Sequence, residues 1–114
     1  MGKNTTLKFR AVNRDIFEAI KNGSKKIETR AATKKFKNIR AGDRIVLVCG
    51  KQRFENVVKA VRHFKTIKAM LKKYKIRQVN PWVSTEQELR QVYWNFPNYK
   101  EKIKKYGIIA FELK

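Results

Sequence analysis

The longest uninterrupted run of apolar residues, from Ile45 to Cys49, places the strongest constraint on the fold. No polar side chain alternates with the apolar ones, so the run predicts a central strand that is buried on both faces. A hairpin turn at residues 50–53 follows, and the segment from Phe54 to Phe64 is expected to return as a long strand. Apolar residues between Val57 and Val61 break the alternation of this second strand, which predicts a β-bulge or bend there.

Further strand and helix patterns lie on either side of this hairpin. Leu7 to Val12 alternates apolar and polar residues like a half-buried strand, and Asn13 is placed to cap a helix that runs through Asn22. Lys25 to Ala31 has the pattern of another strand, and Ile108 to Leu113 has that of a closing strand. Strands from both ends of the chain must therefore meet to complete one sheet.

Between the hairpin and the closing strand, apolar residues recur at helical spacing and predict three helices. The first has its apolar stripe within residues 67–74, the second begins at Ser84, and the third is a short helix after Asn98. This order of elements is typical of a small α+β domain with a bent sheet or pseudo-barrel. We expect one domain over residues 1–114, with a flexible N-terminus at residues 1–5.

The charge balance narrows the choice of partner. The chain has 29 Lys and Arg residues against 9 Asp and Glu residues, which gives a formal net charge of +20. Such self-repulsion destabilises a compact chain, and a polyanionic partner explains it most simply, because each cation near a phosphate releases condensed counterions. Solubility is the alternative explanation, although acidic residues would serve it as well or better. We therefore expect a nucleic-acid partner.

Single residues exclude several other classes of protein. Cys49 is the only cysteine and His63 the only histidine, so no internal disulfide, no Cys-based zinc site and no two-histidine metal site can form. No metal or cofactor is expected, and the apolar strand around Cys49 indicates an inert core residue.

No apolar run approaches the ~20 residues of a membrane span, so we expect a cytoplasmic protein. The sequence from Met1 to Thr6 fits the N-myristoylation pattern at Gly2, which is short enough to occur by chance.

One segment combines a turn, several cations and a carboxylate. It reads Gly23-Ser24-Lys25-Lys26-Ile27-Glu28-Thr29-Arg30. In a pleated strand, Lys26, Glu28 and Arg30 share one face. Exposed cross-strand ion pairs contribute less than ~1 kcal/mol, so a solvated strand face hardly explains the pattern. Glu28 lies between cations and is expected to stay ionised and to accept hydrogen bonds.

The spacing G-x-K-x-x-E-x-R, formed by Gly23, Lys25, Glu28 and Arg30, resembles the signature of ASCH domains. The resemblance extends from about residue 7 to residue 113. It implies a PUA-like pseudo β-barrel of about five to six mostly antiparallel strands with flanking helices. It also implies a cleft beside the barrel that is suited to RNA or a modified nucleoside. Lys25 is expected in the turn before the pleat begins, where it can share this cleft with Glu28 and Arg30.

The resemblance also implies roles for these residues. Lys25 and Arg30 would contact a phosphate or a base edge, while Glu28 would accept a hydrogen bond from a base amine or orient Arg30. Some members of the family remove the acetyl group of N4-acetylcytidine, with a Thr at the position of Glu28, a matching Lys, and a Glu before a late helix. Residues 80–84 hold no carboxylate, so this sequence departs from their pattern. If the protein is an enzyme, Lys25 and Glu28 are the candidate catalytic residues.

Further candidates for nucleic-acid contacts lie outside the motif. Trp82 follows a proline in a predicted loop and Trp94 lies off the apolar stripe of its helix, so both are candidates for base stacking. Tyr93 and Phe96 belong to that stripe and are expected in the core. The full set of candidate nucleic-acid-binding residues is Lys25, Lys26, Glu28, Arg30, Arg10, Trp82, Trp94 and Tyr106.

Three functional hypotheses follow from the sequence. The first is an RNA-binding module with a basic surface for phosphates and a Lys25/Glu28/Arg30 cleft for a nucleotide. The second is a hydrolase that acts on a modified nucleoside, similar to the N4-acetylcytidine amidohydrolases, or a ribonuclease. The third is a regulator that binds a protein or an anionic membrane, for which the basic amphipathic segment Lys65 to Arg77 is the relevant feature. A monomer is expected in each case.

Overall fold

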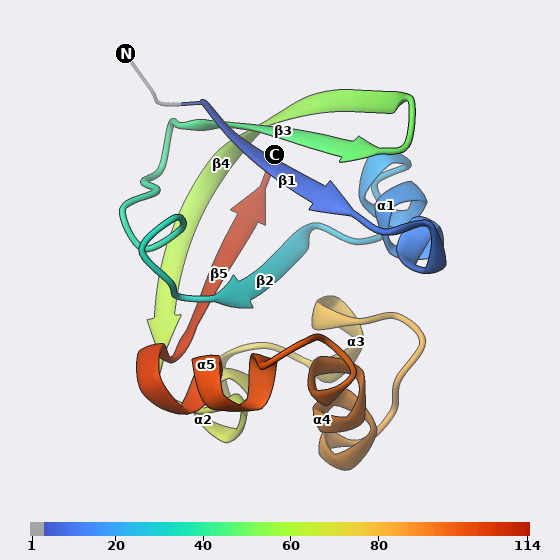
Figure 1. Ribbon diagram of the computed structural model, residues 1–114. Coiled ribbons are helices and arrows are strands. Elements are labelled where there is room, and N and C mark those ends of the chain that lie inside the picture. The colour runs from blue at the N-terminus through green and yellow to red at the C-terminus, as the bar shows by residue number, and fades with distance from the viewer. Residues whose placement is uncertain (1–3) are drawn as a thin grey trace.

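The chain forms a strongly curved sheet with a layer of helices at one end (Figure 1). The computed structural model describes residues 4–114. Within that range, five strands lie in the order β1-β3-β4-β5-β2, with β1 and β3 parallel and the other neighbours antiparallel. The strands are β1 (Asn4–Phe9), β2 (Ile27–Ala31), β3 (Arg44–Cys49), β4 (Gln52–Phe64) and β5 (Ile108–Leu113). The sheet makes a half-barrel, which confirms the expected α+β fold of mostly antiparallel strands.

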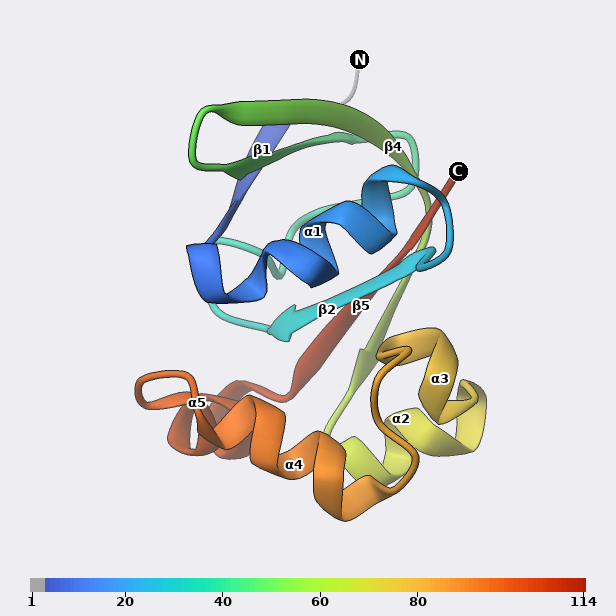
Figure 2. The same ribbon diagram turned by 90° about the vertical axis from the view of Figure 1, so that its right-hand side faces the viewer.

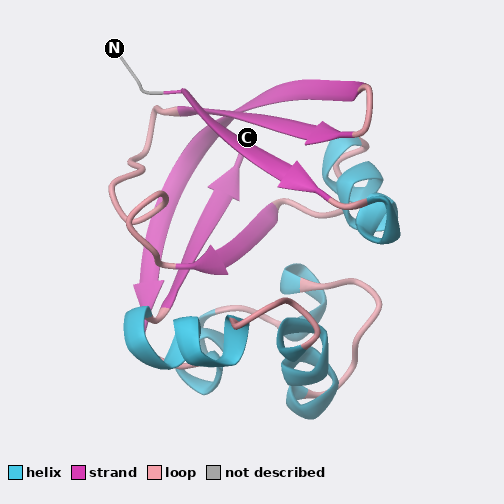
Figure 3. Cartoon of the chain, viewed as in Figure 1, coloured by secondary structure: helices cyan, strands magenta, loops and turns pink. Residues whose placement is uncertain are grey.

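Helices connect and flank these strands (Figure 3). They are the 3₁₀ helix η1 (Ala11–Asn13) and the α-helices α1 (Arg14–Lys21), α2 (Ile67–Lys73), α3 (Ile76–Val79), α4 (Glu86–Trp94) and α5 (Tyr99–Tyr106). Helix α1 lies between the β3–β4 hairpin and β2, whereas α2 to α5 form a separate helical layer on the other side of β2 (Figure 2). None of the helices found in residues 4–114 has the length and apolar character needed to cross a membrane.

Strand β4 produces the curvature of the sheet. Its first part pairs with β3 and its second part pairs with β5. The register shifts between Val58 and Ala60, which confirms the irregularity expected in this segment. Because the sheet bends here, its two outer strands approach each other. The guanidinium of Arg30 in β2 lies 4.8 Å from the ring centroid of Phe9 at the end of β1.

The position of β3 agrees with the apolar run that predicted it. The strand lies between β1 and β4, and Ile45, Leu47 and Cys49 are fully buried beneath α1 and the curved sheet. Val46 points to the opposite face and is also buried, while Val48 is half-buried. The expected central strand is therefore confirmed, with Val48 as the position that retains some contact with solvent.

Two hydrophobic cores share strand β5. The first core fills the half-barrel beneath α1, and Phe17 of α1, Ile109 and Phe111 belong to it. The second core lies between the helical layer and the sheet, and Ile108 and Ala110 belong to it. Successive side chains of a strand point to opposite faces, so β5 contributes alternate residues to each core. Burial of apolar surface on both faces thus holds the helical layer at a fixed position relative to the half-barrel.

Some predicted boundaries near the N-terminus were wrong. The first strand is Asn4–Phe9 rather than Leu7 to Val12, because the chain turns into η1 and leaves Val12 77% exposed. Asn4 and Thr5, expected in a flexible N-terminus, pair with β3. Residues 1–3, which include the candidate myristoylation site at Gly2, lie outside the described residues.

Helix starts in the second half also differ from the prediction. The short helix α3 was not predicted, and α4 is capped by Thr85 rather than by Ser84. The Thr85 hydroxyl accepts a hydrogen bond from the Glu88 amide at 3.1 Å, and the Glu88 carboxylate accepts one from the Thr85 amide at 3.1 Å. This reciprocal capping box explains why the helix begins one residue later.

Candidate functional site

A cavity of about 320 Å³ lies between the half-barrel and the helical layer. Its walls come from the end of β1, from β2, from η1 and α1, and from α4, α5 and the loop between them. We call this cavity the cleft. The side chains that line it include four aromatic residues, Phe9, Tyr93, Phe96 and Tyr99, and five cations, Lys8, Arg10, Lys25, Arg30 and Lys102.

The motif residues of β2 form a hydrogen-bonded cluster at the base of the cleft. Lys25 and Glu28 are almost completely buried, at 3% and 5% exposure. The Lys25 Nζ lies 3.1 Å from Glu28 Oε1 and also donates to the carbonyl of Ile27. On the other side, Arg30 donates to Glu28 Oε2 from Nη2 at 3.1 Å and from Nε at 3.3 Å. Strand β2 begins at Ile27, so Lys25 lies before the strand, as the resemblance to ASCH domains implied.

The Glu28 carboxylate is saturated by these neighbours. A carboxylate has about four acceptor positions. Oε1 accepts from Lys25 and from the Thr29 amide at 3.1 Å, and Oε2 accepts twice from Arg30. Burial alone would raise the pKa of Glu28, but the charges of Lys25 and Arg30 outweigh it, so the pKa lies below its ordinary value. Of the two roles considered for Glu28, orientation of Arg30 therefore fits the geometry better than contact with a base amine.

Arg30 is the member of the cluster that reaches the open part of the cleft. Its side chain is 18% exposed, and its guanidinium stacks 4.8 Å from the ring centroid of Phe9 and 5.9 Å from that of Phe36. Glu28 and the two rings fix the plane of the guanidinium. Among the hydrogen bonds of residues 4–114, Nη1 has no acceptor. This edge of Arg30 can therefore donate to a ligand.

Aromatic residues of the helical layer form the opposite wall. The rings of Tyr93 and Tyr99 stack with centroids 6.2 Å apart. The Tyr93 hydroxyl hydrogen-bonds the hydroxyl of Thr29, and the Tyr99 hydroxyl accepts from the Ala31 amide at 3.1 Å. Burial raises the pKa of both phenols, so both stay neutral. Their hydroxyls therefore fasten the helical layer to β2 and leave ring surface facing the cleft.

Two further cations lie over aromatic rings at the edge of the cleft. The Arg10 guanidinium lies 5.0 Å from the ring centroid of Phe96, and the Lys102 ammonium lies 6.0 Å from that of Tyr99. Cation–π contacts of this kind hold a flexible cation near one place without neutralising its charge. Arg10, a candidate from the sequence, thus lies in the cleft beside the motif residues.

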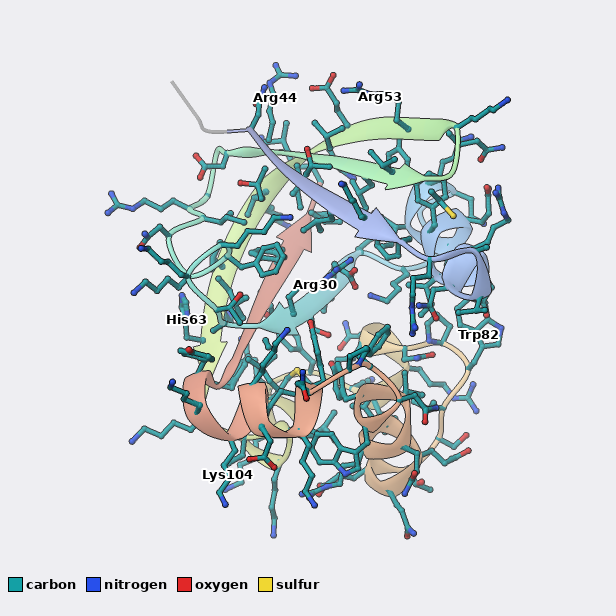
Figure 4. All side chains as sticks on the ribbon, viewed as in Figure 1. Arg30, Arg44, Arg53, His63, Trp82 and Lys104 are labelled. Atoms are coloured by element: carbon teal, nitrogen blue, oxygen red, sulfur yellow. The ribbon has the colours of Figure 1, made fainter. Side chains whose placement is uncertain are left out.

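The other candidate residues lie outside the cleft. Lys26 is exposed just before β2, and Trp82 is 54% exposed in the loop between α3 and α4 (Figure 4). Trp94 is half-buried and packs against the core of the helical layer, so it is not displayed as a free ring. Tyr106 is 47% exposed at the end of α5, with the Lys105 ammonium over its ring.

Sequence reasoning missed several cleft residues. Phe9, Tyr99 and Lys102 were not among the candidate contact residues, and Tyr93 and Phe96 were assigned to the core. Tyr93 does belong to the core of the helical layer, but it also lines the cleft. Tyr93, Phe96 and Tyr99 recur at intervals of three residues, and this was the available signal. The series nevertheless crosses the end of α4 and the start of α5, where helical periodicity does not apply.

The titratable residues that could serve metal or thiol chemistry are dispersed. Across residues 4–114, no group of three or more His, Cys, Asp or Glu residues could hold a metal ion. Cys49 is fully buried in β3, which agrees with the core position that the sequence predicted. His63 lies on β4, away from the cleft, beside Lys37 and Arg40.

Comparison with known proteins identifies the family. The sequence profile of the ASCH domain matches residues 11–114. The crystal structure of hypothetical protein PH0355 is similar to this chain, with 35% sequence identity, a TM-score of 0.81 and coverage of 100% of this chain and 98% of that one. The solution NMR structure of protein PF0455 from Pyrococcus furiosus is also 35% identical, with a TM-score of 0.73 and coverage of 100% and 96%. No curated protein matches. The profile match covers nearly the whole chain and agrees with the fold and the Gly23–Arg30 motif, so the protein belongs to the ASCH domain family.

Proposed function

We propose that this ASCH domain binds RNA and that the cleft holds one nucleotide of it. The observation that carries the proposal is the buried Lys25–Glu28–Arg30 cluster, which presents a fixed guanidinium edge to a cavity walled by aromatic rings. A planar guanidinium suits both a phosphate and the acceptor edge of a base. Aromatic walls suit the flat faces of a base.

The charge of the cleft supports an anionic ligand. Five cations line it, and Glu28 is the one carboxylate among its lining residues in positions 4–114. That carboxylate is already paired with Lys25 and Arg30. A cleft with four cations in excess favours a phosphorylated nucleotide over a neutral nucleoside, because the low-dielectric walls strengthen the attraction to a phosphate.

The surface outside the cleft supports a polymer rather than a free nucleotide. The chain carries a formal net charge of +20, far more than one phosphate needs. Exposed cations on the sheet and on the helical layer can bind successive phosphates of a strand and release counterions. The proposed module therefore combines general attraction to the backbone with one fixed nucleotide site.

Fluorescence anisotropy with a labelled single-stranded RNA across a salt series tests this proposal. The affinity of the native protein should fall steeply as salt rises. Arg30→Ala should weaken binding at least about 10-fold, as expected for loss of a charged hydrogen bond of ~1.5–3 kcal/mol. Arg53→Ala is the matched control, because Arg53 is an exposed arginine on β4 outside the cleft.

The outcomes separate the two parts of the proposal. A larger loss in Arg30→Ala than in Arg53→Ala supports the nucleotide site. Equal losses would mean that the basic surface acts alone and that the cleft holds no nucleotide. Absence of salt-sensitive binding to any RNA would refute the function altogether.

One observation favours hydrolysis of a modified nucleoside as a second candidate function. Burial lowers the pKa of Lys25, and the neighbouring carboxylate of Glu28 only partly opposes this. A lowered pKa eases the loss of the lysine proton, and only the neutral amine can act as a general base that activates water against an acyl group. Incubation with N4-acetylcytidine, followed by chromatography for cytidine and acetate, tests this function. Turnover that disappears in Lys25→Ala would support it, and no turnover by the native protein would exclude this substrate.

A further inference from the structure

Trp82 is the most exposed aromatic residue between positions 4 and 114, at 54% exposure. Single exposed apolar side chains are common on protein surfaces, so exposure alone carries no conclusion. The indole ring nevertheless offers a broad flat surface, and Trp82 belongs to neither of the two hydrophobic cores. Two properties decide whether the ring can bind a ligand: the hydrogen bonds that hold its loop, and the position of the loop relative to the cleft.

The loop that carries Trp82 is fixed on both sides of the ring. The Trp82 amide donates to Asn80 Oδ1 at 2.9 Å. The guanidinium of Arg77 donates to the Pro81 carbonyl at 3.2 Å and to the Ser84 hydroxyl at 3.0 Å, so it spans the loop. A ring on a fixed backbone loses little conformational entropy when a flat ligand stacks on it.

The loop begins in the wall of the cleft. Asn80 is 6% exposed and lines the cleft, and Trp82 follows only two residues later. Two residues of chain span at most about 7 Å, so Trp82 lies close to that wall. Figure 4 shows Trp82 on the outer side of its loop, at the level where the half-barrel faces the helical layer. Consecutive bases of a stacked strand lie about 3.4 Å apart, and farther when the strand is splayed, so a neighbouring base can bridge this distance.

The surroundings of Trp82 suit a nucleic-acid strand. The positive charge of Arg77, in α3, is held against this loop by the bonds to Pro81 and Ser84. Glu86 pairs with Arg90 at 2.6 Å, and Glu88 caps α4. An exposed ring on a loop that is held by an arginine suits a base next to its phosphate.

We propose that Trp82 is a second base-binding site, on which the base adjacent to the nucleotide in the cleft stacks. The ligand is then a single-stranded RNA segment of at least two nucleotides, because in a duplex the face of each base is covered by its neighbours. This inference rests on the proposed function of the cleft. It adds the path by which the RNA leaves the cleft, which runs past Asn80 toward the α3–α4 loop.

The test compares short and long ligands in three proteins. Native protein, Trp82→Ala and Trp82→Phe are titrated with the four nucleoside 5′-monophosphates and with the four homopolymeric pentaribonucleotides. Stacking of a base on an aromatic ring contributes ~1–3 kcal/mol, so Trp82→Ala should weaken pentanucleotide binding about 5- to 140-fold. Mononucleotide binding should not change, and Trp82→Phe should recover much of the loss. Thermal unfolding checks that each variant is folded.

Tryptophan fluorescence provides an independent measurement. In a Trp94→Phe protein, Trp82 is the sole tryptophan, since the chain has two. A pentanucleotide should quench its emission, whereas a mononucleotide confined to the cleft should not. Equal pentanucleotide affinities of native protein and Trp82→Ala would overturn the Trp82 site while leaving the cleft intact. If neither ligand class binds to native protein, the proposed function and this inference fall together.

Discussion

Replacement of Glu28 by Gln tests whether the buried cluster is held together by charge. The substitution keeps the shape of the side chain but removes its negative charge. The two cations that the carboxylate compensates, Lys25 and Arg30, are 2% and 18% exposed at their side chains. The amide of Gln would also turn N–H donors toward the N–H groups of one of its partners.

The structure allows an estimate of the loss. Removal of one partner from a buried ion pair costs about 3–5 kcal/mol. Arg30 can turn its exposed edge into water, so we expect about 3 kcal/mol, at the lower end of that range. For a chain of 114 residues, at roughly 4 °C per kcal/mol, the midpoint of thermal unfolding should fall by about 12 °C. Calorimetry and guanidinium titration measure both quantities.

The effect of Glu28→Gln should depend on pH in a defined direction. The pKa of Glu28 in the folded protein lies below its ordinary value of 4.5. The stability that this group contributes is therefore fully present above pH 4.5 and is lost as the pH falls through the lower folded pKa. The difference in unfolding free energy between native protein and Glu28→Gln should be constant near neutral pH and should shrink on acidification.

Glu55→Gln is the matched control for this prediction. The Glu55 carboxylate is 50% exposed and lies 3.9 Å from Arg44, so its removal should cost less than ~1 kcal/mol. If Glu28→Gln is as mild as Glu55→Gln, or if its effect does not change with pH, the account of the cluster as a charge-compensated unit is wrong.

Three further outcomes are expected elsewhere in the fold. Gly107→Ala should destabilise the protein by more than ~2 kcal/mol or prevent folding. The reason is that φ is +79° at this position and that a Cβ would lie 2.4 Å from the carbonyl oxygen of Phe64. Soluble yield and urea unfolding measure the effect. Thr85→Ala should cost about 1 kcal/mol in urea unfolding through loss of the hydroxyl that accepts from the Glu88 amide, whereas Thr85→Ser should be nearly neutral. The thiol of Cys49 is fully buried, so its reaction with an aromatic disulfide reagent should follow the rate of unfolding, and immediate reaction of the folded protein would contradict its place in the core.

The features that the sequence predicted correctly are those that depend on near neighbours. The apolar run at Ile45 to Cys49 required burial on two faces wherever the strand lay, and the structure buries it in that way. Local chain geometry sets such a feature, so a single sequence is sufficient to predict it. The position of Lys25 beside Glu28 was instead implied by the resemblance to ASCH domains, because strict alternation along the strand would place the two side chains on opposite faces.

The features that were missed depend on contacts between distant segments. Nothing near Phe9 indicates that Arg30 will cover its ring, because the bend in β4 brings the two strands together. The same holds for the bond from the Ala31 amide to Tyr99, which joins positions 68 apart in the sequence. Long-range packing decides these contacts, and so the composition of the cleft could not be derived from local patterns.

Residues of the cleft also supply hydrogen-bond partners to backbone groups that the open half-barrel leaves unpaired. An incomplete barrel leaves its outer strands with unpaired backbone groups, which can pair with other chains. Along β2, side chains occupy these positions: Lys25 donates to the Ile27 carbonyl, Glu28 accepts from the Thr29 amide, and the Tyr99 hydroxyl accepts from the Ala31 amide. Lys25 and Glu28 thus provide hydrogen-bond partners along the free edge of β2. Glu28 also orients Arg30 toward the cleft. The spacing of Lys25, Glu28 and Arg30 therefore serves the stability of an open barrel as much as its surface chemistry, so the opening persists as a place for a ligand instead of an edge for aggregation.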